Sequence, residues 1–205
     1  MRFNLRSRVV ILSITLAAVL LASTMAAEDK GFRAGPASSY PHQESEKVTI
    51  GAKPYTSADD VESAFGKKID FGRYGVVPVL VVVENKREKA LDMRELEASL
   101  VATDGRQAKA VPPEDLPFLA TEGHPPNQTG VKLPVPVHIP KKNPLNSPEI
   151  AIRAFSAKML APGDSASGFF YFEAKPEAGD KLYVNGLKDA RSQQELLYFE
   201  FGLGK

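Results

Sequence analysis

The run from Tyr74 to Asn85 constrains the fold more than any other part of this sequence. It reads Tyr-Gly-Val-Val-Pro-Val-Leu-Val-Val-Val-Glu-Asn and is followed by a polar segment. A β-branched run bounded in this way predicts a buried strand. Its apolar residues fall on both faces, which indicates a central strand with something packed on each side. Because Pro78 cannot donate to a strand ladder, we expect regular pairing to begin at Val79.

Other segments carry weaker strand patterns. The segment 88–102 fits either a helical stripe or an alternating strand, but Asp104-Gly105 predicts a hairpin turn. A hairpin needs a strand on each side, so we assign a strand to 95–102. The remaining strands are expected at 48–55, 165–173 and 181–184 and at the C-terminus, where Leu197, Phe199, Phe201 and Leu203 share one face.

Helical signals are few. Ser57 is a plausible N-cap, and the acidic residues behind it suit the first turn of a helix, so one short helix is predicted near 58–65. Ser147-Pro148-Glu149 could begin a second helix, but the apolar pattern over 148–157 also fits a strand, and both readings stay open.

These elements predict an all-β fold, with about seven or eight strands in a single sandwich domain. Several turn and core motifs are similar to those of immunoglobulin-like domains in uncharacterised bacterial envelope proteins and lipoproteins. The resemblance covers roughly 48–203 and rests on Phe65-Gly66, Gly75-x-x-Pro78, Val81-Val-Val-Glu-Asn85, Asp104-Gly105, Leu160-x-Pro162-Gly163 and Gly168-Phe-Phe-Tyr-Phe172. It implies an immunoglobulin-like β-sandwich outside the cytoplasm and brings no catalytic residues with it.

The N-terminal 27 residues predict an export signal. Three arginines precede an apolar run over 9–22, and small residues follow, so cleavage is expected near Ala26 or Ala27. An uncleaved membrane anchor is the alternative, and it is the one route by which we expect membrane contact. The sequence thus divides into a signal peptide (1–27), a flexible linker (28–46) and an immunoglobulin-like β-sandwich domain (47–205), in the periplasm or outside the cell.

Charge and cysteine content exclude several classes of function. Cleavage removes three arginines from a chain of 26 basic and 25 acidic residues, which leaves the exported protein slightly acidic. Such a balance gives no electrostatic basis for binding nucleic acid. Without cysteine, the chain has no disulfides, no cysteine-based metal site and no cysteine nucleophile.

A proline-rich insertion over 112–148 interrupts the strand patterns and holds ten of the 16 prolines. A loop this long is uncommon unless it has a function or is disordered. It could cover a sheet edge and prevent pairing with other molecules, or it could bind a partner. The candidate partner-binding residues are its exposed polar and basic side chains, namely His124, Asn127, Lys132, His138, Lys141 and Lys142.

No catalytic, cofactor-binding or metal-binding residue can be nominated. The three histidines are not at metal-binding spacing, and no nucleophile or phosphate-loop motif occurs. The acids Glu84, Asp92, Asp104 and Asp164 stand where turns favour carboxylates, so they do not suggest an acid/base pair. We therefore expect no cofactor and no enzymatic activity.

The sequence predicts an exported binding or structural protein of the bacterial envelope. Its partner would be another envelope protein or a surface polymer. Two alternatives remain: a protease inhibitor that presents a loop, and a hydrolase whose active site has no recognisable motif.

Overall fold

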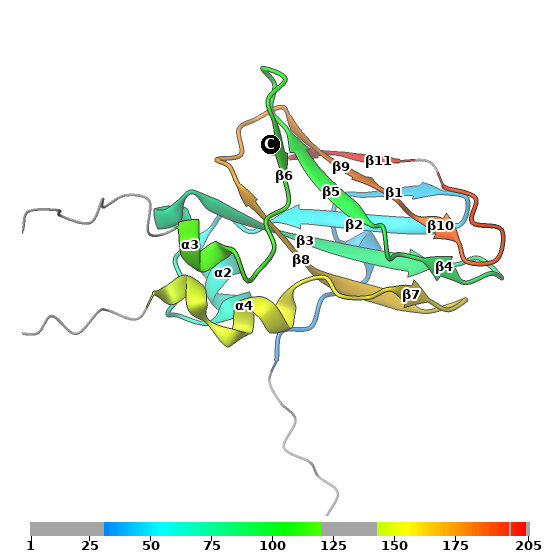
Figure 1. Cartoon of the computed structure of the whole chain (residues 1–205), viewed down its shortest axis with the longest axis horizontal. Coiled ribbons are helices and arrows are strands. Elements are labelled where there is room, and N and C mark those ends of the chain that lie inside the picture. The colour runs from blue at the N-terminus through cyan, green and yellow to red at the C-terminus, as the bar shows by residue number, and fades with distance from the viewer. Residues whose placement is uncertain (1–30, 120–142, 197, 204–205) are drawn as a thin grey trace, which may run out of the picture. The chain divides into compact units, whose positions relative to one another are not determined.

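The computed structural model describes residues 31–119, 143–196 and 198–203, which form antiparallel sheets with a few short helices (Figure 1). The β3 sheet has the order β1-β2-β3-β8, the β9 sheet has the order β11-β9-β5-β6, and a small sheet has the order β10-β4-β7. The prediction of an all-β sandwich is confirmed. Eleven strands occur in these residues: β1 (His42–Ser45), β2 (Val48–Pro54), β3 (Val76–Asn85), β4 (Leu91–Asp92), β5 (Glu97–Val101), β6 (Gln107–Lys109), β7 (Met159–Leu160), β8 (Ser165–Glu173), β9 (Asp180–Asn185), β10 (Lys188–Asp189) and β11 (Phe199–Leu203).

Strand β3 is central, as its sequence predicts, and lies between β2 and β8. The prediction that pairing starts after Pro78 holds for one side of the strand only. On the β2 side the ladder ends where Val79 faces Pro54. On the β8 side it already starts at Val76, and Pro78 itself faces Tyr171.

The two faces of β3 belong to two different cores. Val77, Val79, Val81 and Val83 point into the core between the two large sheets. Val76, Leu80 and Val82 point to the opposite face of the β3 sheet, into a second core. Because both sets are buried, the strand is apolar throughout instead of alternating.

The aromatic run that ends at Phe172 suggests, from sequence alone, a strand that packs on β3 from across the sandwich. The structure corrects this expectation for β8. Strand β8 is the neighbour of β3 in the same sheet, and Phe172 faces Val77. The elements opposite β3 are those of the β9 sheet, which contributes apolar side chains to the shared core: Ala98, Leu100, Leu182, Val184, Phe199, Phe201 and Leu203.

Short helices cover the outer face of the β3 sheet. The helix predicted near 58–65 is confirmed as α2 (Ala58–Phe65), and the Ser57 hydroxyl accepts a hydrogen bond from the Asp60 amide at 3.1 Å. The other helical elements are α3 (Leu116–Leu119), α4 (Pro148–Arg153) and three 3₁₀ turns at Ala37–Ser39, Gly72–Tyr74 and Pro144–Asn146. Together they bury the second core and add a third layer to the sandwich.

The segment 148–157, which the sequence left open, holds a helix followed by an extended stretch. Helix α4 ends at Arg153, and Ala154 then forms a parallel bridge with Phe169 of β8. The helical alternative therefore holds over 148–153, and only one isolated bridge follows it.

The prediction of a flexible linker over 28–46 is wrong for its described part. Strand β1 pairs with β2 over four residues, and the side chain of Ala37 is fully buried. The carbonyl oxygen of Ala37 lies so close to Gly51 that a Cβ there would be 2.4 Å away. The compact unit thus begins at Phe32. A polar composition concealed this because β1 is an exposed edge strand.

The predicted signal peptide lies outside the described residues. Among the helices that are described, none is long and apolar enough to cross a membrane.

Candidate functional site

All six candidate partner-binding residues, His124, Asn127, Lys132, His138, Lys141 and Lys142, lie outside the described residues. The structure does describe both ends of the insertion that carries them, over 112–119 and 143–148. We call the contacting residues Leu116, Pro117, Asn143 and Leu145 the loop base.

Asn143 closes the loop base. Its Nδ2 donates a hydrogen bond to the carbonyl oxygen of Pro117 at 2.8 Å, across 26 positions in the sequence. Its Oδ1 accepts a hydrogen bond from the amide of Leu145 at 3.0 Å and so caps the 3₁₀ turn that follows. One side chain therefore fixes the start of the returning segment and joins it to the departing one.

Two leucines anchor the loop base in the second core. Leu116 and Leu145 are 0% and 1% exposed. Both belong to the apolar cluster that includes Tyr171 of β8. Burying a leucine side chain contributes about 1.5–3 kcal/mol, so the base is held by packing as well as by the amide of Asn143.

The segments that flank the insertion lie along the free edge of β8. The amide of Val111 donates to the carbonyl oxygen of Tyr171 at 2.7 Å, and the amide of Phe155 donates to that of Phe169 at 3.0 Å. A Cβ on Gly168 would lie 2.4 Å from the Cα of Phe155, so only glycine permits this crossing. Edge coverage, one of the two roles we considered for the insertion, is thus performed by its flanks.

Tyr171 ties helix α4, which follows the loop base, to the sheet. Its hydroxyl donates to the carbonyl oxygen of Ile150 in α4 at 2.7 Å. Burial raises the pKa of the Tyr171 phenol, which stays protonated as this bond requires. Its ring stacks on Phe71 at 5.8 Å between centroids, beside Phe65 at 6.2 Å.

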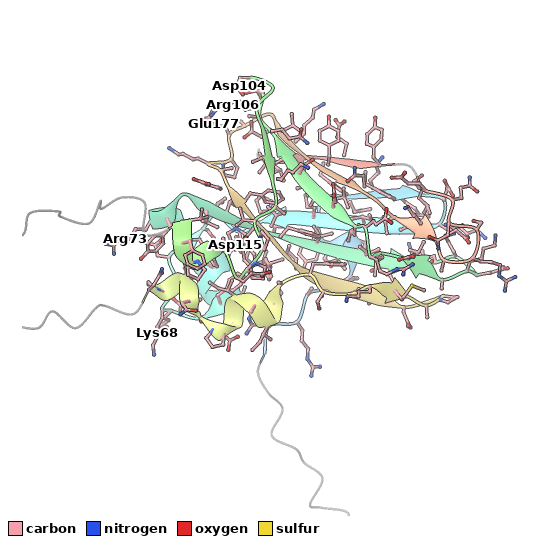
Figure 2. The ribbon with its side chains drawn as sticks, in the orientation of Figure 1. Lys68, Arg73, Asp104, Arg106, Asp115 and Glu177 are labelled. Carbon is pink, nitrogen blue, oxygen red and sulfur yellow. The ribbon has the colours of Figure 1, made fainter. Side chains whose placement is uncertain are left out.

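Six charged side chains are labelled in Figure 2, in two parts of the domain. Asp104 and Arg106 lie at the tip of the β5–β6 hairpin with Glu177 beside them, while Lys68, Arg73 and Asp115 lie at the end of the domain where the helices are. The Asp104 pKa lies below its usual range because the amide and guanidinium of Arg106 both donate to it. The three side chains labelled at the helical end carry both signs of charge.

A pocket of about 630 Å³ lies beside α2, a volume within the range of small-molecule sites. Buried apolar residues form its floor, and polar residues surround its mouth. Burial raises the pKa of Tyr55 to about 12, and Tyr40 and Asp60 act in the same direction, so the phenol is neutral at physiological pH. The floor includes Tyr55, Val61, Ile69, Phe71 and Val76, and the mouth includes Ser57, Glu62, Lys67 and Lys175.

The acids set aside in the sequence are engaged in structural contacts. Glu84 accepts from the amide of Ala37 at 2.8 Å. The guanidinium and amide of Arg94 hold the pKa of Asp92 well below its usual range. Within the described ranges, no three His, Cys, Asp or Glu side chains are grouped so that they could hold a metal ion.

Two buried polar residues instead fix the small sheet. The side-chain amide of Asn85 donates to the carbonyl oxygens of Lys89, Leu160 and Ala161. Asp189 accepts from the amides of Arg191 and Ser192 and pairs with Arg87 at 3.0 Å. The amides of Ser192 and Arg191, with the Ser192 hydroxyl and Lys89, lower the Asp189 pKa to about 2.

Sequence reasoning missed the loop base, although one signal was available. Asn143-Pro144 is a turn-initiating pair, and an asparagine before a proline often caps a short helix. No local signal indicates that the Nδ2 group of Asn143 reaches the carbonyl oxygen of Pro117. The pocket beside α2 had no sequence signal, because its walls come from segments that are far apart in the chain.

Comparisons with known proteins give no family. No family model matches the chain, and no curated protein matches it. Among solved structures, a protein of Bacillus subtilis assigned as a lipoprotein (ycdA) matches with a TM-score of 0.38 and 11% identity, over 80% of this chain and 38% of that one. The chain therefore spans less than half of that protein. A secreted protein of Mycobacterium tuberculosis, MPT63, matches with a TM-score of 0.33 and 13% identity, over 81% of this chain and 95% of that one. At these scores neither similarity assigns a fold or a function to this chain.

Proposed function

We propose that this protein is an exported binding protein of the bacterial envelope and that it contacts its partner through the insertion over 112–148. The partner is another envelope protein or a surface polymer, and the protein acts by binding and not by catalysis. The immunoglobulin-like resemblance and the N-terminal export pattern of the sequence support the location. The observation that carries the binding role is the closed loop base.

A closed base favours a recognition loop because it limits the conformations that the loop must lose on binding. The bond between Asn143 and Pro117 brings the two ends together, and Leu116 and Leu145 hold them in the core. Recognition loops are commonly carried by a rigid scaffold of this kind.

The scaffold under the loop is independent of the loop itself. The bond from Tyr171 to Ile150 and the edge contacts of Val111 and Phe155 all lie outside the segment that would be removed in a test. The segment 121–141 can therefore be replaced by a short Gly-Ser linker without touching the base. Asn143 must be kept.

The test is photocrosslinking in cells, with the crosslinking amino acid at Lys132 in the intact protein. In the intact protein we expect this position to capture one discrete partner. When the rest of 121–141 is replaced by a linker and the crosslinking amino acid is kept, we expect that partner to be lost. The matched control places the crosslinker at Arg106, whose side chain is 85% exposed on the hairpin tip. Capture at Arg106 but not at Lys132 would contradict the proposal.

The two alternatives give different results. Inhibition of a protease at stoichiometric concentration, lost in the linker variant, would identify an inhibitor. Turnover of an ester, peptide or glycoside substrate by the linker variant as well as by the intact protein would identify a hydrolase instead.

A further inference from the structure

The outer face of the β9 sheet is uncovered by any described element, unlike that of the β3 sheet. Its strands alternate: buried side chains point to the shared core, and exposed or half-buried ones point outward. We call the outward side the outer β9 face. The residues that matter below are Ser99, Lys181, Tyr183, Tyr198, Glu200 and Gly202.

Two tyrosines form an aromatic platform on this face. The rings of Tyr183 and Tyr198 lie 5.9 Å apart between centroids, at an interplanar angle of 41°. Tyr198 is 58% exposed, which makes it one of few large apolar side chains exposed in the described residues. Exposed rings with a hydroxyl at one end are typical of binding surfaces, where one side is apolar and the other hydrogen-bonded.

The polar groups beside the platform are fixed in place. Tyr183 faces Glu200 across the ladder, and the nearby carboxylate raises the pKa of its phenol. Lys181 pairs with the same carboxylate at 2.6 Å. These two partners, Lys181 first, lower the Glu200 pKa, so the carboxylate is ionised at neutral pH. A preorganised group of this kind loses less entropy when a ligand binds.

At Gly202 no side chain projects from the outer β9 face, so the backbone beside these groups is accessible. Gly202 is an exposed residue inside β11, it faces Lys181 across the ladder, and a Cβ at this position would meet nothing within 4 Å. Neither packing nor backbone conformation requires glycine here. Glycine weakens a strand, and an unexplained one often marks where another molecule approaches the backbone closely.

The charge on the face narrows the class of partner. The ammonium of Lys181 pairs with Glu200, and the outward charges on β5 and β6, Glu97 and Lys109, are also of opposite sign, so the face carries no net charge. A nucleic acid or a polyanion would find no basic patch here. The face does offer both donors and acceptors, including the hydroxyls of Ser99 and Tyr198 next to apolar rings. A chain of uncharged sugars has the complementary properties, because its rings present apolar C–H faces and its hydroxyls both donate and accept.

We propose that the outer β9 face binds an uncharged polysaccharide chain, with Tyr198 and Tyr183 packed against sugar rings and Glu200 and Lys181 bonded to hydroxyls. The site is distinct from the loop over 112–148 and does not depend on it. No described element encloses this face, which suits an extended polymer and not a small ligand that must be enclosed.

Affinity electrophoresis of the purified protein tests the proposal, with gels that contain soluble β-1,4-glucan, β-1,3-glucan, mannan or xylan. Polygalacturonate and chitosan serve as charged polymers. We expect at least one uncharged glycan to retard the protein. In Tyr198→Ala and Tyr183→Ala the affinity for that glycan should fall about tenfold or more, the loss typical of removing an aromatic anchor. Tyr198→Phe should retain binding.

Two variants separate binding from folding. Gly202→Val adds a β-branched side chain beside Tyr183 and Glu200; it should leave thermal stability unchanged or raised while it abolishes retardation. Ile152→Ala removes an apolar side chain of α4 that is 74% exposed. It should change neither the thermal stability nor the retardation by glycan.

Several results would overturn the proposal. These are retardation by none of the uncharged glycans, retardation only by the charged polymers, or undiminished retardation of Tyr198→Ala and Gly202→Val. Loss of retardation in the linker variant of 121–141 but not in the tyrosine variants would assign the glycan to the loop. A dimer in sedimentation that Gly202→Val dissociates would show that a second copy of the chain occupies this face.

Discussion

The two large sheets share one core but differ in what lies on their other faces. On the β3 sheet, Phe169 points outward from β8 and is 2% exposed, because the rings of Tyr55 and Phe65 pack on it at 5.0 and 4.7 Å. On the β9 sheet, Tyr198 points outward beside β11 and is 58% exposed. The first aromatic side chain is part of a core, and the second is part of a surface.

The difference shows how a sandwich can be stabilised on one side and left available on the other. Helices α2, α3 and α4 cover the β3 sheet, and the same layer anchors the loop base. The β9 sheet needs no cover because its outward residues are polar or amphipathic. Stability is therefore expected to depend on the covered face, and binding of a glycan on the open one.

The largest expected effect comes from truncating one outward aromatic residue on each sheet. Phe169→Ala should lower the free energy of unfolding by about 3–5 kcal/mol, because it leaves a cavity among packed rings. Tyr198→Ala should change it by less than about 0.5 kcal/mol, because its ring is largely in solvent. Denaturant unfolding measures both. Equal losses would mean that the open face is a packing surface after all.

A smaller effect is expected from adding one methyl group to each sheet. Gly168→Ala should destabilise the fold by about 1–3 kcal/mol, because its Cβ would collide with the backbone of Phe155. Gly202→Ala should be neutral or stabilise by up to about 1 kcal/mol, since its Cβ points into open space and the unfolded chain becomes less flexible. Thermal unfolding of the pair decides this, and destabilisation by Gly202→Ala would argue against an open face.

The smallest expected effect is on acid stability. The ionised Asp189 carboxyl, with its pKa lowered to about 2, stabilises the fold above the ordinary carboxyl range. That stabilisation is lost as the pH falls from about 4 towards 2. Asp189→Asn should therefore flatten the decline in stability over this range. Glu200→Gln, on the exposed β9 face, should flatten it less. Unfolding followed from pH 7 to pH 2 compares them, and parallel curves for Asp189→Asn and the parent protein would contradict the assignment.

Local patterns predicted the strands better than they predicted the partners of those strands. The limits of β8 and α2 follow from alternation and from the Ser57 cap, which act over a few residues. That β8 lies beside β3, and not across from it, depends on backbone pairing between residues about 90 positions apart. Strand β1 was missed because an exposed edge strand has no buried face to give it an apolar period.

The candidate site was predicted in part. The proline content indicated the insertion, and the residues nominated within it remain untested predictions. Its base could not be foreseen, because the bond from Asn143 to Pro117 joins two turns whose sequences show no sign of each other. The platform of Tyr183 and Tyr198 was equally hidden, although the alternation of each strand placed both side chains away from the core.

The sequence alone determined that this protein is a β-sandwich with a central strand buried on both faces. The spacing of apolar residues along each strand shows which of its faces are buried. The sequence also determined the long proline-rich insertion. Only the tertiary structure decided which sheet is covered, where the insertion is anchored and which aromatic residues stay in solvent. These features depend on contacts between segments that are distant in the sequence. The hydrophobic effect that drives such contacts is non-directional, so an apolar residue does not specify which other residue it will pack against.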